Sequence, residues 1–195
     1  MLGENSLDPS KILFCGIYWL STDGNVKWLS KSPYPIGARD RETYEGLKKR
    51  GVNTELIGCA TMTLPKYEGP RSGVISVDID GPGERMTHSI GRKLSLEMEW
   101  KGCLEVIHKY GKAKEVHTSR LHVALPCIAM GTPVRYAGRM EGRTTILKEI
   151  GLKHNVMGLP DLSEWKSRYL EFLSRHIGMV APLDAPVMPE APPDP

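Results

Sequence analysis

The chain alternates between short runs bounded by turn residues and longer segments in which apolar residues recur at helical spacing. The short runs predict β-strands over 12–18, 36–38, 54–57, 74–79, 115–118 and 133–136. The longer segments predict helices over 25–30, 41–50, 96–110, 121–130, 143–150 and 161–177. Strands that alternate with helices predict an α/β fold with mostly parallel, Rossmann-like sheets flanked by helices.

Two stretches divide the chain. Residues 66–71 are mostly polar and contain Gly69-Pro70, so we place a boundary there. It separates a reduced N-terminal α/β segment, 1–65, from a C-terminal Rossmann-like domain, 66–178. Proline then recurs after Gly178 with little other sequence between, which predicts a disordered tail over 179–195.

Composition narrows the function classes. The 195 residues are 40% hydrophobic and 25% charged, which is typical of a globular protein. The net charge of +3 is small and the basic residues are scattered, which argues against a nucleic-acid partner. No apolar stretch approaches the roughly 20 residues of a membrane span, and the first residues do not have the pattern of a signal peptide. We therefore expect a cytoplasmic protein.

The cysteines do not have the spacing of a metal site. None belongs to a Cys-x-x-Cys pair, and each lies in or beside an apolar segment. We expect buried free thiols in a reducing compartment, without a disulfide, a bound metal or a cofactor. The four residues are Cys15, Cys59, Cys103 and Cys127.

The junction between the strand over 115–118 and the following helix carries the strongest chemical signal. It places Ser119, Arg120 and His122 at the helix start. Free N–H groups at a helix start favour an anion, and a guanidinium grips phosphate or carboxylate through two parallel hydrogen bonds. His122 can bond the same anion or move a proton near neutral pH. The junction therefore predicts a pocket for a small, doubly charged acid.

This junction and the helix behind it resemble the C-terminal signature of the polysaccharide pyruvyl transferase family. A second segment resembles the family's middle block, in which Arg-Asp and Thr are followed by a helix, Gly-Val and Gly-Cys-x-Thr-x-Thr-Leu. The matching residues are Pro35-Ile36-Gly37-Ala38-Arg39-Asp40, Thr43, Leu47, Gly51-Val52-Asn53 and Gly58-Cys59-Ala60-Thr61-Met62-Thr63-Leu64-Pro65. The resemblance covers most of 34–152, and two ordered blocks are more specific than either alone.

The resemblance implies transfer of a pyruvyl group from phosphoenolpyruvate to a saccharide acceptor. It also implies a glycosyltransferase-B-like pair of domains, of which the first is reduced here. Arg120 and His122 would be catalytic: Arg120 would clamp anionic oxygens, and His122 would be a general acid or a second anion contact. The residues implied to bind substrate are Ser119, Arg39, His88 and Arg143. The family's acceptor-side motif, of the Asn-x-Gly-Asp type, has no match, so we expect a homo-oligomer or a companion chain as an alternative source of that half.

Several candidate residues have a structural alternative. Asp40 is more simply the cap of the following helix than a group acting on a sugar hydroxyl, whereas Arg39 either enters the cleft or is its exposed neighbour. Asp78 lies where ligands bind in open sheets, but it is more simply a solvated carboxylate than a metal ligand. Pro126 either kinks the helix near His122 or marks a helix that begins late.

Two other functions fit the same residues. A glycosyltransferase-B-type enzyme could use a nucleotide sugar, because a fold does not fix a function. A truncated relative could instead bind an anionic ligand without turnover.

Overall fold

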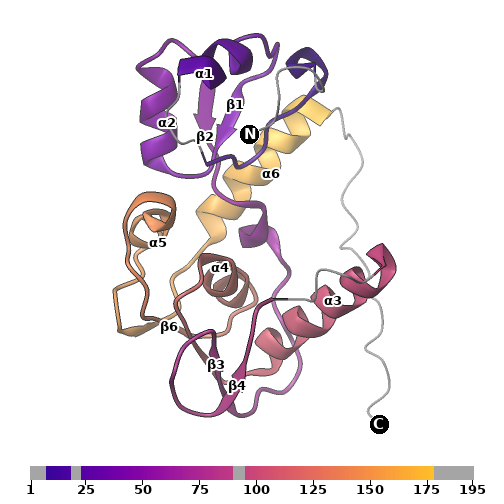
Figure 1. Ribbon diagram of the computed structural model, residues 1–195, viewed down its shortest axis with the longest axis vertical. Coiled ribbons are helices and arrows are strands. Elements are labelled where there is room, and N and C mark those ends of the chain that lie inside the picture. Colours follow the sequence, from indigo (N-terminus) through magenta and orange to yellow (C-terminus); the bar gives the residue numbers. More distant parts are fainter. Residues whose placement is uncertain (1–7, 19–22, 90–94, 178–195) are drawn as a thin grey trace.

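The computed structural model describes residues 8–18, 23–89 and 95–177, which form two β-sheets (Figure 1). The smaller sheet pairs β1 (Ile36–Ala38) with β2 (Thr54–Leu56) in parallel. The larger sheet has five strands in the order β4-β3-β5-β6-β7. Figure 1 places the small sheet at one end of the molecule and β3, β4 and β6 at the other. The tail predicted to be disordered, 179–195, lies outside the described residues.

One helix makes the crossover between the two parallel strands of the small sheet. α2 (Arg41–Lys48) joins β1 to β2, and the Asp40 carboxylate accepts a hydrogen bond of 2.9 Å from the Thr43 N–H. This confirms Asp40 as the helix cap. α1 (Asp23–Leu29) precedes the sheet. The buried side chains of Leu29, Ile36, Leu47 and Val52 form a core of their own.

The strand predicted over 12–18 is wrong. The segment runs beside β1 as extended chain, with only a single parallel bridge between Ile17 and Ala38. Gly16 has φ +71°, a left-handed conformation that interrupts a strand ladder. A Cβ at Gly16 would lie 2.8 Å from the Gly58 carbonyl oxygen, so glycine is required at this position.

The larger sheet confirms the prediction of a mostly parallel sheet flanked by helices. Its parallel strands are β3 (Val74–Val77), β4 (Glu84–Met86), β5 (Glu115–Thr118) and β6 (Val134–Tyr136). Strand β7 (Met157–Gly158) pairs with β6 in the antiparallel direction. The sequence pattern did not predict β4 or β7.

The return of the chain from β3 to β4 depends on a close backbone contact. The Ser76 hydroxyl donates to the Pro82 carbonyl oxygen at 2.7 Å and so holds the loop 78–83 against the sheet. Gly83 has φ +77°, and a Cβ there would lie 1.9 Å from the Val74 carbonyl oxygen. The loop can be this short only because Gly83 allows it to lie against β3.

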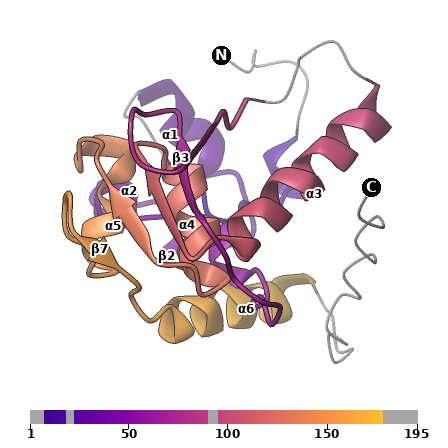
Figure 2. The ribbon, with the colours of Figure 1, turned by 90° about the horizontal axis from the view of Figure 1, so that it is seen from below.

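Two helices pack into the core of the larger sheet: α3 (Leu96–Lys112), which precedes β5 in the sequence, and α4 (Leu121–Ala129), which follows it. α3 continues past Gly111, which was predicted to end it, and α4 is almost wholly buried. The helix predicted over 143–150 divides into a 3₁₀ turn (Gly142–Thr144) and α5 (Ile146–Glu149). Trp100 is 65% exposed because the first half of α3 projects away from the sheet (Figure 2). Within the described residues, no helix combines the length and the apolar character that a bilayer span requires.

α6 (Ser163–Ile177) packs against the core of the larger sheet and also forms a third apolar cluster beside the small sheet. It begins where expected, with the Asp161 carboxylate accepting from the Ser163 N–H at 3.0 Å. Its first turn packs Trp165 into the core of the larger sheet. Farther along, Tyr169 and Phe172 pack on Ile57 beside the small sheet (Figure 1). The last helix therefore holds the two sheets together.

Two shorter 3₁₀ turns complete the described elements: η1 (Pro9–Lys11) and η2 (Ala60–Thr63). η2 carries buried Met62 and packs against both α4 and α6. It thus lies between α4, the helix at the predicted junction, and α6.

Arg71 ties together the carboxyl ends of two helices. Its guanidinium donates to the Gly111 carbonyl near the end of α3, and to the Met130 carbonyl, 2.6 Å away, just after α4. It also donates to the Thr132 hydroxyl. Helix carboxyl ends carry carbonyl groups without helical partners and partial negative charge, which a cation satisfies.

We expect Arg71→Ala to lower the free energy of unfolding by about 2 kcal/mol, because it leaves several partly buried carbonyls without donors. Arg71→Lys should recover only part of the loss, since an ammonium does not have the guanidinium's spread of donors. Chemical denaturation measures both. Arg85→Ala is the control: its exposed ion pair with Asp80 should contribute within about 0.5 kcal/mol. Equal stability of Arg71→Ala and native protein would contradict the role of Arg71.

Candidate functional site

The predicted site residues lie beyond the carboxyl ends of parallel strands. Asp78 follows β3, His88 follows β4 by one residue, Arg120 follows β5 by one residue and Arg139 comes shortly after β6. Parallel strands end at one edge of a sheet, which is where open α/β sheets bind ligands. Arg39 follows β1 of the small sheet and reaches the same region, as described below.

A cavity of about 590 Å³ opens at this edge. It brings together three of the predicted residues, Ser119, Arg120 and Arg143, and adds Arg139 and Glu141, which were not predicted. Arg139 could have been found by the reasoning that selected Arg120, because it too follows a parallel strand. The remaining lining residues are Leu121, Tyr136, Gly142 and Thr144.

Arg120 lies at the start of α4 with most of its donors open to the cavity. It occupies the N-cap position, and no side chain caps the helix among the described residues. Its own N–H donates to the Thr118 hydroxyl at 3.0 Å. Its guanidinium donates through Nε to the Asp78 carboxylate at 3.0 Å, and the side chain is 57% exposed. A cation and a helix start with free N–H groups therefore meet at one point.

His122 is the second residue of α4; it is half-buried and is not part of the cavity lining. Burial lowers its pKa, and the positive charges of Arg39 and Arg143, with His88, lower that pKa further. His122 is therefore close enough to Arg39, Arg143 and His88 for their charges to change its pKa. In the ligand-free protein His122 is thus a neutral imidazole near pH 7.

Pro126 lies inside α4, which begins at Leu121. The alternative in which the helix begins only at the proline is therefore wrong. Proline has no N–H for the carbonyl four residues earlier, which is that of His122. The His122 carbonyl therefore lacks the usual helical hydrogen bond from residue 126.

Arg39 is buried, so its interpretation as an exposed neighbour of Asp40 is wrong. Only 6% of the residue is exposed. Its Nη2 donates to the Arg143 carbonyl at 2.6 Å, its Nε donates to Asp40 at 3.3 Å, and its guanidinium lies over the Tyr18 ring. Arg39 therefore fixes the segment that carries Arg143 against the end of β1.

His88 is held from two sides. Its Nδ1 lies 3.0 Å from the hydroxyl of Tyr110, which is fully buried on α3. Its backbone N–H donates to the Asp78 carboxylate at 3.4 Å. Burial lowers the His88 pKa and outweighs the charge of Asp78, which raises it. His88 does not line the cavity, but its charge acts on His122.

The carboxylate of Asp78 accepts hydrogen bonds from the Arg120 guanidinium and from the segment after β4. Partial burial raises its pKa, but hydrogen bonds from Thr87, His88 and Arg120 hold the pKa below its ordinary value. No group of three metal-ligating side chains gathers within residues 8–18, 23–89 and 95–177.

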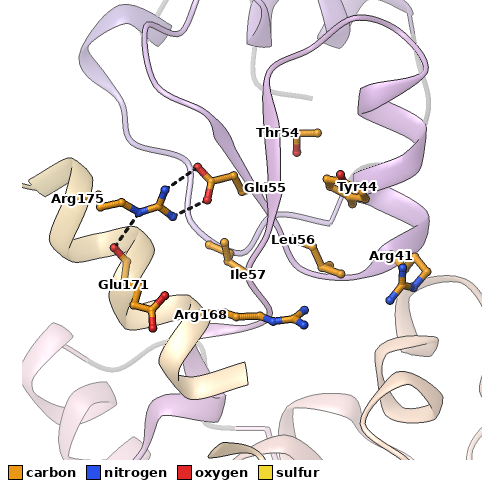
Figure 3. Close-up of a pocket in the computed structure, with 9 residues that line it drawn as sticks. All are labelled: Arg41, Tyr44, Thr54, Glu55, Leu56, Ile57, Arg168, Glu171 and Arg175. Atoms are coloured by element: carbon orange, nitrogen blue, oxygen red, sulfur yellow. Dashed lines mark hydrogen bonds and ion pairs between the residues drawn. The ribbon is translucent and has the colours of Figure 1, made fainter. Parts of the chain in front are cut away.

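A second cavity, of about 510 Å³, lies between α2, β2 and α6 (Figure 3). It contains Arg41, Arg168 and Arg175, but two of these cations already have carboxylate partners. Figure 3 shows Arg175 against both oxygens of Glu55, with Nη2 at 2.5 Å from Oε2. Arg168 pairs with Glu164. Its lining holds three arginines and two glutamates, whereas the lining at Arg120 holds three arginines and one glutamate, so this cavity is the weaker anion site.

Comparison with known proteins shows the family of the chain. The family model for polysaccharide pyruvyl transferase matches residues 21–138, a range that includes Arg39, His88, Arg120 and His122. No curated protein and no solved structure matches the chain.

The lowered pKa of His122 predicts a loss of stability in acid. As the pH falls below about 6.5, the unfolded chain takes up a proton at this position before the native one does, so the native state is progressively disfavoured until its own lower pKa is passed. Melting temperatures measured from pH 7.5 to 5 should therefore fall less steeply for His122→Asn than for the native protein. His154→Asn, at an exposed position, is the control. Equal slopes for native protein and His122→Asn would contradict the assignment.

Proposed function

The chain belongs to the polysaccharide pyruvyl transferase family, and from this premise we propose that it transfers a pyruvyl group from phosphoenolpyruvate to a saccharide. The observation that carries the proposal is the cavity at the sheet edge, where Arg120, Arg139 and Arg143 line one space. Glu141 is the carboxylate among its lining residues. A cavity with this excess of guanidinium groups suits a small ligand with several negative charges.

Phosphoenolpyruvate fits this site through its two anionic groups. The terminal nitrogens of Arg120 and the N–H groups at the start of α4 bind the phosphate, because both point to the same end of the helix. Arg143 and Arg139, which line the same cavity, bind the carboxylate. Ser119 adds a hydroxyl donor to the lining. Arg39 supports Arg143 from beneath through the backbone hydrogen bond.

The reaction needs a proton and a stabilised cationic centre. A proton adds to the methylene carbon of phosphoenolpyruvate, and the adjacent carbon becomes oxocarbenium-like. One sugar hydroxyl attacks this carbon, the bond to the phosphate oxygen breaks, and a second hydroxyl closes the ketal. Of the two hydroxyl protons, one balances the proton gained by the methyl group and the other leaves with phosphate.

His122 serves this chemistry as the proton donor or as a further contact to the anion. The two roles share one electrostatic origin. Burial and neighbouring cations keep the imidazole neutral in the free site by lowering its pKa. A bound trianion reverses the local potential and raises that pKa, so the proton arrives together with the donor.

We also propose that the two sheets correspond to the two halves of a glycosyltransferase-B-like enzyme. Residues 1–65 form the reduced first half and 66–178 the donor-binding half. The core of the small sheet, formed by Leu29, Ile36, Leu47 and Val52, lies wholly within the first half and supports this division, whereas Cys59 and Met62 of that half pack into the core of the larger sheet. Two contacts join the halves beside the cavity: Arg39 to the Arg143 carbonyl, and the Arg41 N–H to the Glu149 carboxylate at 3.0 Å. The acceptor would then lie between them.

We expect Arg120→Ala and Arg143→Ala each to weaken phosphoenolpyruvate binding by tenfold or more, because a charge-assisted hydrogen bond contributes about 1.5–3 kcal/mol. Titration calorimetry measures the dissociation constants, and Arg85→Ala is the control outside the cavity. If the native protein binds a nucleotide sugar but does not bind phosphoenolpyruvate at millimolar concentration, the alternative function as a glycosyltransferase is favoured. Binding without phosphate release in the presence of saccharides would favour the non-catalytic relative.

Phosphoenolpyruvate binding should take up protons. Calorimetry at pH 7.5 in two buffers of different ionisation enthalpy gives the number of protons absorbed per ligand. His122→Asn should abolish most of this uptake, because the raised pKa in the complex belongs to that imidazole. Uptake that is unchanged in His122→Asn would assign the proton to another group and contradict the role proposed for His122.

A further inference from the structure

One carboxylate contacts three of the segments that form the edge of the site. Asp78 directly follows β3 and accepts hydrogen bonds from the His88 N–H after β4, at 3.4 Å, and from the Arg120 Nε after β5, at 3.0 Å. The Thr87 hydroxyl donates to it as well. The ends of β3, β4 and β5 are therefore joined through a single side chain.

The backbone at Asp78 is unusual. Its φ is +54°, in the left-handed region that residues other than glycine seldom adopt. Aspartate and asparagine tolerate this conformation better than other residues with a side chain. The carboxyl group of Asp78 is only 14% exposed, whereas the Arg120 side chain that it contacts is 57% exposed. A sheltered, hydrogen-bonded carboxylate thus holds a largely exposed cation.

The hydrogen bond to Asp78 uses Nε of Arg120 and leaves its two terminal nitrogens for a ligand. Asp78 accepts from Nε, whereas the two terminal nitrogens form the edge that grips a phosphate through parallel hydrogen bonds. A guanidinium held by Nε has lost its freedom to rotate about its long side chain. It meets a ligand already aligned, so less conformational entropy is lost on binding.

We propose that Asp78 is a positioning residue that orients Arg120, and through its loop His88, for the bound anion. The inference rests on the proposed function for the identity of that anion. It gives Asp78 a role other than the two considered from sequence, a metal ligand or a solvated carboxylate. It also accounts for a strained, acidic residue beside a pocket that must bind negative charge, where a free carboxylate would weaken binding.

The test combines a double-mutant cycle with a matched control. Asp78→Ala should weaken phosphoenolpyruvate binding about tenfold in the native background, the scale of one charge-assisted hydrogen bond. In the Arg120→Ala background the same substitution should change binding less than about twofold, because Asp78 acts through Arg120. Equal losses in both backgrounds would overturn the proposal.

Two further variants separate positioning from folding. Asp78→Asn keeps an acceptor oxygen and the left-handed backbone, so its affinity should lie between those of native protein and Asp78→Ala. Asp80→Asn makes the same chemical change in an exposed ion pair two residues away and should leave affinity unchanged. A loss in Asp80→Asn as large as that in Asp78→Asn would overturn the proposal.

Measurements on the ligand-free protein distinguish this inference from the proposed function. By NMR, the Nε–H resonance of Arg120 should shift and broaden in Asp78→Asn. The His88 pKa should fall in that variant, because the charge of Asp78 raises it in the native protein against the opposing charge of Arg120. If phosphoenolpyruvate does not bind but both signals change, the proposed function fails and the positioning role stands. If it binds and neither signal changes, the positioning role is overturned.

Discussion

Strands β3, β4, β5 and β6 run in parallel, so the residues that follow them meet along one edge of the sheet. The site depends on this constraint. Asp78, Arg120 and Arg139 are far apart in the sequence. They lie at one edge of the sheet because the strands that they follow run in the same direction. The hydrogen bond from Arg120 to Asp78 then converts a row of strand ends into a fixed arrangement. The helix start behind Arg120 adds a preference for anions that needs no side chain.

The small sheet contributes through its contact with the larger one. Arg39 is among the most buried charged residues, and it is tolerated because Asp40 and the Arg143 carbonyl accept its hydrogen bonds. Burying a cation without partners would cost several kcal/mol, so these contacts constrain how the two sheets meet. α6 adds apolar contacts to both parts: Trp165 packs into the core of the larger sheet, and Phe172 clusters with Ile57, just after β2. The position of Arg143 in the cavity is thus set from both sides of the molecule.

Sequence predicted local features well and long-range ones poorly. Strand 115–118 and the start of α4 were predicted almost to the residue, because apolar periodicity and turn residues act within a few positions. β4 and β7 were not predicted because they have only three and two residues, too few to show an apolar alternation, and β7 forms by pairing with β6, more than twenty residues earlier. The burial of Arg39 was not predicted either, since its partner lies at residue 143. Of the candidate site residues, Ser119, Arg120 and Arg143 share the cavity lining, while Arg39, His88 and His122 are connected to it by contacts or charge.

The central claim is that the sheet edge at Arg120 holds the keto-acid donor. A crystal structure of the native chain with phosphoenolpyruvate tests it most directly. We predict the phosphate within hydrogen-bonding distance of the terminal nitrogens of Arg120 and the first N–H groups of α4, with Nε still on Asp78. Donor bound instead in the hollow between α2 and α6, or with Arg120 turned away from it, would contradict the account.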